Sequence, residues 1–362
     1  MILPILLYNG AMAVVDLIAC RVLKRQPGPW NWFRTTVRAA LAAGCLAVVL
    51  GMSPFAIMRL ATYGVFLHGP IVLGSSAVLL WSAGRKTAIL SATAACVVVG
   101  VGIDAFLIEP TWLEVSHLRI ASSKIQQPLR LVVLADLQTD QFGPYERMVL
   151  RRVLQEQPDV ILLAGDYFQA SGPLREELRI QLNDYLHEID FKAPAGVFAV
   201  EGNIDSYDWP ELFDGLPVTT LRTTSTLDVG GIRLTCLSLS DSRSRSPQLA
   251  AAVADRYHVV LGHVPNFALG TDDADLLIAG HTHGGQVRLP WIGPIMTLAS
   301  IPRSWAAGVT DLPQGGKLLV SRGVGMERRS APRLRFLCRP ELVVIDLVPE
   351  GLKPQMHTDK HR

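Results

Sequence analysis

Short apolar runs that end in metal-binding residue types constrain this chain of 362 residues more than any other feature. Four runs cover residues 131–135, 160–165, 197–202 and 258–262, and a fifth ends at Gly280-His281-Thr282-His283. Runs of this length bounded by glycine are typical of buried strands, and the carboxyl ends of strands in an α/β sheet meet at one edge. We therefore expect one rim to collect the polar residues that follow the runs: Asp136, Gln138, Asp166, Asn203, His263, His281 and His283.

The N-terminal third has a different character. It contains apolar segments near residues 1–20, 37–58, 61–82 and 87–108, each about the ~20 residues that a helix needs to span a bilayer. The hydrophobic fraction of the whole chain, 49%, is high for a soluble protein, and the excess lies almost wholly in these segments. The pattern predicts about four transmembrane helices over residues 1–110. Asp16 makes the first segment the costliest to insert, by about 2.5–3.5 kcal/mol, and His68 beside Pro70 is expected inside the bundle.

Basic residues flank these segments unevenly. The stretch after the first segment carries Arg21, Lys24, Arg25, Arg34 and Arg38, and the loop before the last carries Arg85 and Lys86. The positive-inside rule places both on the cytoplasmic side. We therefore expect a multi-pass protein of the cell (inner) membrane whose C-terminal domain is extracytoplasmic.

The rest of the chain predicts an α/β domain at residues 128–348, joined by a linker at 111–127 and followed by a tail at 349–362. Helical spacing occurs at 145–155, 174–187 and near 247–254. Further strands are expected at 226–229, 232–239, 317–321 and 342–347. Mixed strands and helices in this order predict two packed sheets flanked by helices.

Charge and cysteines exclude several classes of protein. The net charge of +2 without a basic stripe argues against nucleic-acid binding. The absence of a CxxC pair excludes a zinc ribbon. Cys236 and Cys338 have the alternatives of a disulfide or two buried free thiols, and we expect thiols.

The motifs Asp136-Leu137-Gln138, Gly165-Asp166, Gly202-Asn203, Gly262-His263 and Gly280-His281-Thr282-His283 occur in an order that resembles the calcineurin-like metallophosphoesterases. The segments 284–290, 321–325 and 335–341 further resemble the membrane-associated YkuE/YaeI-type branch. This resemblance covers roughly residues 128–348. It implies a four-layer α/β/β/α sandwich with two divalent metal ions.

The resemblance also implies residue roles. Asp136, Gln138, Asp166 and His283 would hold one ion, and Asp166, Asn203, His263 and His281 the other, with Asp166 bridging. Asp166, Asn203, Asp205 and His281 form the implied catalytic set. Carboxylate, amide and imidazole ligands suit Mn, Fe or Zn without selecting among them. Asp166 or Asn203 alone would be compatible with a simple turn after glycine, but the joint pattern favours a metal site.

Two positions depart from the family pattern. Gln138 stands where most relatives have histidine, and Ile204 stands where many have a histidine that protonates the leaving group. General acid catalysis is typically worth about 10²–10⁴-fold. Without it, the chain favours a leaving group that departs as a stable anion, as in a pyrophosphate or an activated phosphodiester.

We therefore expect a membrane-anchored phosphohydrolase in which a metal-bridging hydroxide attacks a phosphodiester or pyrophosphate of a phosphorylated small molecule or lipid-linked substrate. One alternative is a UDP-2,3-diacylglucosamine pyrophosphatase of lipid A synthesis, which conflicts with the expected topology because its substrate is cytoplasmic. Another is a catalytically degenerate membrane sensor. Candidates for contacting substrate phosphate are Arg243, Arg245, Arg288, Arg322, Arg328 and Arg329.

Overall fold

The computed structural model describes residues 2–247, 249 and 255–352 and consists of two compact units. The helical unit contains the chain up to Ile108 together with the segment Glu327–Leu334. The second unit contains Glu109–Met326 and the chain from Arg335 onward. Most of the helix expected near 247–254 and the end of the tail lie outside the described residues.

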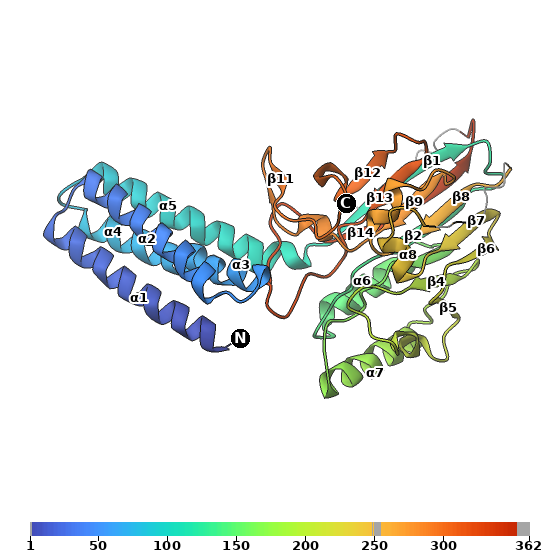
Figure 1. Ribbon diagram of the computed structural model, residues 1–362, viewed down its shortest axis with the longest axis horizontal. Coiled ribbons are helices and arrows are strands. Elements are labelled where there is room, and N and C mark those ends of the chain that lie inside the picture. The colour runs from blue at the N-terminus through green and yellow to red at the C-terminus, as the bar shows by residue number, and fades with distance from the viewer. Residues whose placement is uncertain (1, 248, 250–254, 353–362) are drawn as a thin grey trace. The chain divides into compact units, whose positions relative to one another are not determined.

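The helical unit has four helical stretches that are long and apolar enough to cross a membrane. They are α1 (Ile2–Arg25), α2 (Pro29–Leu50), the continuous run α3 (Pro54–Tyr63), η1 (Gly64–His68) and α4 (Gly69–Leu79), and the run α5 (Arg85–Ile103), η2 (Asp104–Ile108) and η3 (Glu109–Thr111). Helices α1, α2, α4 and α5 run side by side (Figure 1). The expected number of segments is confirmed.

The expected bounds of the second segment are wrong. The chain breaks at residues 51–53, inside the expected segment 37–58, because Ser53 caps α3 by accepting a hydrogen bond from Ala56 N at 3.2 Å. Apolar composition continues across this break, so hydropathy alone does not reveal it. The helix before the break instead begins at Pro29, where proline is favoured in the first turn.

Asp16 and His68 meet inside the helical unit. The carboxylate Oδ2 lies 2.7 Å from His68 Nδ1, and His68 Nε2 lies 3.1 Å from Asn9 Oδ1. Both residues are buried, at 7% and 4% exposure. The imidazole therefore offsets part of the desolvation cost of the carboxylate, and the expected interior position of His68 is confirmed.

The first sheet of the second unit has the order β1-β14-β2-β3-β4-β5. Its strands are β1 (Glu114–Ser122), β14 (Glu341–Pro349), β2 (Leu129–Leu134), β3 (Val160–Leu163), β4 (Val197–Val200) and β5 (Val218–Leu221). Neighbouring strands are parallel except for β14 and β2. Strand β1 corrects the expectation of a linker at 111–127, because it pairs with β14 along its whole length. Only one of its side chains is buried, so its apolar signal is weak.

The second sheet has the order β12-β13-β9-β8-β7-β6. Its strands are β12 (Gly308–Asp311), β13 (Lys317–Val320), β9 (Leu276–Ala279), β8 (His258–Leu261), β7 (Ile232–Cys236) and β6 (Ser225–Val229). The four central strands are parallel, and both edge strands are antiparallel. A small hairpin is formed by β10 (Arg288–Leu289) and β11 (Gly293–Pro294).

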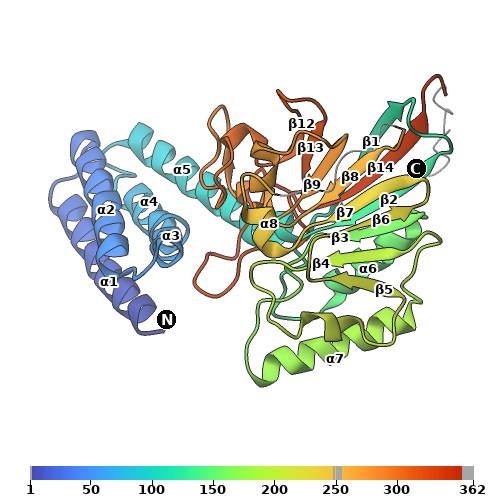
Figure 2. The same ribbon diagram turned by 45° about the vertical axis from the view of Figure 1, so that its right-hand side comes forward.

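The two sheets pack face to face, with Leu131 and Leu162 of one and Leu234 and Val259 of the other in a single buried cluster. Helices α6 (Pro144–Gln155) and α7 (Pro173–Glu188) cover the outer face of the first sheet (Figure 2). The outer face of the second sheet packs against the short turns η5 (Pro265–Leu269) and η7 (Arg303–Trp305), near α8 (Leu239–Arg243). The remaining short turns are η4 (Trp209–Phe213) and η6 (His283–Gly285). The expected layered α/β architecture is confirmed.

Candidate metal centre

The polar residues named from the sequence follow β2, β3, β4, β8 and β9 at one rim of the two sheets. Five of the seven expected ligands have a positive φ: Asp136 at 51°, Gln138 at 32°, Asp166 at 57°, His281 at 69° and His283 at 48°. Non-glycine residues held in this region cost of order 1–3 kcal/mol each and cluster at functional sites. The backbone is therefore strained where these side chains converge.

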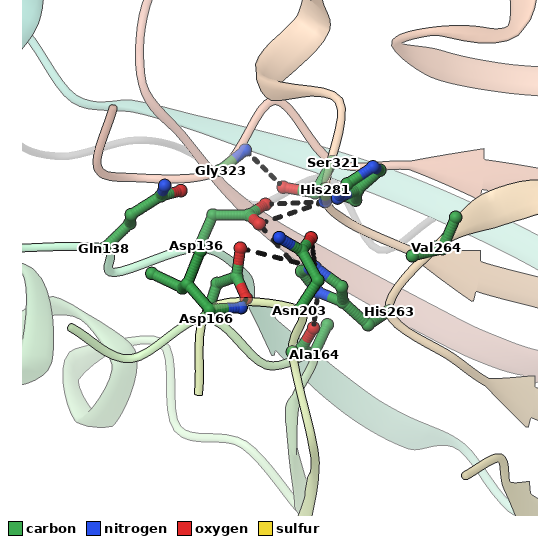
Figure 3. Close-up of polar contacts among 12 residues, drawn as sticks. Asp136, Gln138, Ala164, Asp166, Asn203, His263, Val264, His281, Ser321 and Gly323 are labelled. Atoms are coloured by element: carbon green, nitrogen blue, oxygen red, sulfur yellow. Dashed lines mark hydrogen bonds and ion pairs between the residues drawn. The ribbon is translucent and has the colours of Figure 1, made fainter. Parts of the chain in front are cut away.

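Asp166, His263 and His281 form the centre of the cluster. Each offers one ligand atom, and the three atoms lie within 4.8 Å of one another. The Nε2 atom of His263 also lies 2.9 Å from Asn203 Oδ1 and 3.4 Å from Asp166 Oδ2. Figure 3 shows these side chains pointing toward one another, with Asp136 beside them. Nitrogen and oxygen donors thus surround a common space.

Backbone carbonyls orient both imidazoles. His263 Nδ1 donates to Ala164 O at 2.8 Å, which leaves Nε2 facing the oxygen atoms of Asn203 and Asp166. His281 Nε2 donates to Leu298 O at 3.0 Å, which leaves Nδ1 as its acceptor. A hydrogen bond from the second ring nitrogen is the usual support for a metal-binding histidine.

Asp136 is completely buried beside this centre. Its carboxylate oxygens accept the backbone N–H of His281 at 3.0 and 3.1 Å. Glycine is required next to it, since a Cβ on Gly280 would lie 2.6 Å from Asp136 Oδ2. Burial raises the pKa of Asp136 to about 7, against the lowering effect of His263.

Protonation of the central residues depends on their mutual charges. Burial acts to raise the pKa of Asp166, but the neighbouring His263 holds it below its usual value. Burial acts to lower the pKa of His263, but Asp166 and Asp136 outweigh this and raise it to about 9. The charged form of Asp166 is thus stabilised by the neighbouring His263, and a bound cation would supply positive charge in the same way.

Gln138 and His283 are both buried close to this rim. Gln138 Nε2 donates to Gln169 Oε1 at 3.2 Å, and Figure 3 shows Gln138 apart from the central group. Among the residues that the structure describes, the buried Nδ1 atom of His283 has no hydrogen-bond partner. Burial lowers the pKa of His283 well below its usual value, so the ring is neutral. A buried, neutral imidazole with an unsatisfied nitrogen fits a metal ligand, as does the mixed donor set.

Asp205 contacts the backbone of the ligand loops. Its Oδ2 accepts the N–H groups of Asp166 at 2.9 Å and Gly202 at 2.7 Å, and its Oδ1 accepts that of Tyr167 at 2.9 Å. The loops cross so closely that a Cβ on Gly202 would lie 2.1 Å from Asp166 N. Both oxygens of Asp205 therefore hold the Gly-Asp and Gly-Asn turns together.

Arg335 was not assigned a role from the sequence, yet it is completely buried beneath the rim. Its guanidinium donates to the carbonyl oxygens of Arg322 at 2.8 Å, Gly323 at 3.0 Å and Cys338 at 2.9 Å. Gly323 in turn lies against Asp136, where an added Cβ would be 2.7 Å from the Asp136 Cβ. Arg335 thus fixes the loop that packs on Asp136. No spacing rule distinguishes it from the other arginines nearby in the sequence.

The arginines expected to contact phosphate lie in different environments. Arg322 is paired with Glu341 at 3.1 Å and Glu114 at 3.2 Å, so its charge is already balanced. Arg243 is exposed, and its positive charge contributes to the lowered pKa of His281, after burial and His263. Arg328 and Arg329 belong to the segment grouped with the helical unit. Among the candidates, Arg243 is therefore the arginine whose charge affects a residue of the centre, His281.

The buried cysteines, Cys236 and Cys338, are free thiols, as expected. Cys338 Sγ donates to the carbonyl oxygen of His283 at 3.2 Å. This contact ties the turn that carries His283 to the segment that follows Arg335.

The sequence is similar to known proteins. The calcineurin-like phosphoesterase family model matches residues 129–285. YkuE of Bacillus subtilis, an uncharacterised metallophosphoesterase, is 29% identical over 68% of this chain and 90% of its own. The phosphodiesterase YaeI of Escherichia coli is 29% identical over 72% of this chain and 97% of its own. An uncharacterised metallophosphoesterase of Campylobacter jejuni is 28% identical over 65% of this chain, and the match spans 63% of that protein. By its fold and by this family match, the chain contains a calcineurin-like phosphoesterase domain at residues 129–285 and is similar to bacterial metallophosphoesterases.

Proposed function

We propose that this protein is a membrane-anchored, two-metal phosphohydrolase that cleaves a phosphodiester or pyrophosphate bond. The observation that carries the proposal is the convergence of Asp166, His263 and His281, whose ligand atoms lie within 4.8 Å of one another. Strained backbone at most of the expected ligands supports the same reading. The helices long enough to cross a membrane supply the anchor.

Each group of residues would serve one ion. Asp136, Gln138, Asp166 and His283 would hold the first, and Asp166, Asn203, His263 and His281 the second. When bound, two divalent ions supply positive charge to phosphoryl oxygens and activate water as a nucleophile. Donor chemistry is compatible with Mn, Fe or Zn.

The chain's own residues orient this site and limit its chemistry. Ala164 O and Leu298 O fix the two imidazoles, and Asp205 fixes the loop backbone. The backbone N–H of Ile204 donates to Asp166 Oδ1 at 3.0 Å, and its aliphatic side chain transfers no proton. The proposed substrate therefore carries a leaving group that departs as a stable anion, which favours pyrophosphates and activated phosphodiesters.

The decisive experiment is hydrolysis by the full-length protein in detergent, stripped of metal and then reloaded with Mn²⁺. The test compounds are bis-p-nitrophenyl phosphate, p-nitrophenyl phosphate and a nucleotide diphosphate sugar. We expect Mn²⁺-dependent cleavage of the diester or the pyrophosphate in preference to the monoester. Equal rates in the stripped and reloaded protein would refute the two-metal mechanism.

Gln138 motivates a second candidate function, a membrane sensor that no longer catalyses hydrolysis. Its neutral amide is a weaker metal ligand than the imidazole of a histidine. Metal analysis separates the two functions. Two ions per chain with turnover favour the hydrolase, and fewer than one ion per chain without turnover favours the sensor.

We further propose that the catalytic domain lies outside the cytoplasm, on the evidence of Arg21, Lys24, Arg25, Arg85 and Lys86 beside the apolar segments. A reporter fused after Pro349 tests this orientation. A cytoplasmic signal would reverse it and would revive the UDP-2,3-diacylglucosamine pyrophosphatase alternative, whose substrate is cytoplasmic.

A further inference from the structure

Large apolar side chains are exposed on the β10–β11 hairpin and the loop that follows it. Trp291 is fully exposed at the hairpin turn, and Ile292, Ile295 and Leu298 are exposed by 63%, 43% and 44%. Single exposed apolar residues are ordinary on protein surfaces, but a contiguous group marks a surface that contacts a partner or a membrane. Leu337, exposed by 52%, lines the same cavity as the hairpin.

Basic residues border this apolar group. An open cavity of about 510 Å³ is lined by the hairpin together with Arg288, Arg303, Ser304 and Leu337. Within the part of the chain that the structure describes, neither arginine is paired with a carboxylate. Aromatic and aliphatic side chains beside unpaired arginines are the composition of surfaces that enter the lipid headgroup region.

The hairpin is continuous with the metal centre. His281 Nε2 donates to Leu298 O at 3.0 Å, so the loop after the hairpin contacts an expected metal ligand directly. Gly285 packs so tightly on the base of the hairpin that an added Cβ would lie 2.3 Å from Pro294 Cβ. A surface that receives the hairpin tip would therefore be close to the rim where catalysis is proposed.

We propose that this surface, formed by Trp291, Ile292, Ile295, Leu298 and Leu337 with Arg288 and Arg303, docks on the lipid bilayer and admits a lipid phosphodiester or pyrophosphate to the metal centre. The proposal rests on the phosphohydrolase function and names its substrate class. A bilayer can contact both parts of this surface, because acyl chains can pack against the apolar side chains and lipid phosphates can pair with Arg288 and Arg303. The covalent connection also favours it, since β1 begins at Glu114, shortly after a candidate span that ends at Thr111.

Fluorescence quenching in nanodiscs tests the docking without reference to activity. The full-length protein is reconstituted with phosphatidylcholine and phosphatidylglycerol, with or without bromine on the acyl chains, and total tryptophan emission is measured. We expect Trp291→Phe to lower the fraction of emission that bromine quenches. Trp209→Phe is the matched control, because Trp209 is only 2% exposed and packs inside the second unit. If Trp291→Phe leaves the quenched fraction as high as the control does, the tip faces water and the proposal is wrong.

An activity comparison tests the substrate class. Ile292→Asp is assayed on the p-nitrophenyl ester of phosphatidic acid in nanodiscs and on soluble bis-p-nitrophenyl phosphate, which share a leaving group. Because Ile292→Asp removes an apolar contact with lipid, it should reduce the rate of cleavage of the lipid ester by at least about tenfold. The rate of cleavage of the soluble ester should not change. The control is Met148→Asp, another exposed apolar position, on α6.

Unchanged cleavage of the lipid ester by Ile292→Asp would overturn the proposal. So would a change from dimer to monomer in detergent, which would assign the surface to a second copy of the chain. If the wild type cleaves neither these two esters nor the nucleotide diphosphate sugar, the proposed function fails, while quenching still decides whether the hairpin docks.

Discussion

Each unit of this protein buries carboxylates beside histidines, and the two clusters are built differently. In the helical unit, Asp16 Oδ2 and His68 Nδ1 are 2.7 Å apart. In the phosphoesterase domain, His263 lies 3.4 Å from Asp166 Oδ2 and 4.0 Å from Asp136 Oδ1. Asp16 and His68 thus contact each other directly, whereas the expected ligand atoms of Asp166, His263 and His281 face a common space.

The backbone shows the same contrast. His68 lies in a helical turn, while Asp136, Asp166 and His281 have positive φ. Direct contact between the two side chains on regular backbone fits a structural pair, and separated donors on strained backbone fit a functional site. We therefore propose that the same residue types serve stability in the helical unit and metal binding in the second unit, and each of the following variants tests that proposal.

The largest effect should come from Asp166→Asn, which removes the carboxylate shared by both expected ion sites. Loss of a residue that merely supports a ligand costs roughly 10–100-fold, so loss of this ligand should exceed about 100-fold in kcat/KM. Hydrolysis of bis-p-nitrophenyl phosphate and metal content per chain are the measurements. Asp311→Asn is the control, because the Asp311 side chain is 81% exposed. Wild-type activity in Asp166→Asn would show that this cluster is structural too.

The second largest effect should come from the pair Asp16 and His68 in the helical unit. His68→Leu leaves Asp16 buried without its imidazole, which should destabilise the helical unit by roughly 3–5 kcal/mol. The double variant Asp16→Leu/His68→Leu removes both polar side chains and should recover most of this loss. Unfolding followed by circular dichroism in detergent measures both. A single variant as stable as the wild type would mean that the pair does not stabilise the unit.

Asp205→Asn should have an intermediate effect. Its carboxylate accepts three backbone N–H groups from the Gly165–Tyr167 and Gly202 turns. An amide presents an N–H group to one of these donors, so the turns should shift and kcat/KM should fall by roughly 10–100-fold. A positioning role predicts that metal affinity weakens in parallel, which isothermal titration with Mn²⁺ can measure. Lost turnover with unchanged metal affinity would instead support the direct catalytic role expected from the sequence.

The smallest effect is expected for Arg243→Gln. The positive charge of Arg243 is a minor contributor to the lowered pKa of His281, so we expect Arg243→Gln to raise KM by about fivefold to tenfold with little change in kcat. Arg245→Gln is the neighbouring control, since Arg245 is also exposed. Steady-state kinetics on the soluble diester separate the two variants, and equal KM values would exclude Arg243 from phosphate binding.

Several features of the fold were predictable because they depend on local order along the chain. The apolar runs before Asp136, Asp166, Asn203, His263 and His281 become strands with those residues at their carboxyl ends. The layered α/β fold follows from the same alternation of runs. Strand β1 was missed because its half-exposed edge position leaves little apolar pattern.

The sequence by itself determined which residue types reach the rim, because a strand places the next residues at its end whatever surrounds it. It also determined that four segments are apolar enough for a membrane. Tertiary structure decided which partners the charged side chains contact: Asp205 accepts the backbone N–H of Asp166, Arg322 pairs with Glu341, and Asp16 contacts His68. Arg335 acquired its place beneath Asp136 in the same way. These partners lie 12 to 52 residues apart in the chain. The free energy of a buried charge depends on the groups that folding places beside it, not on its neighbours in the sequence.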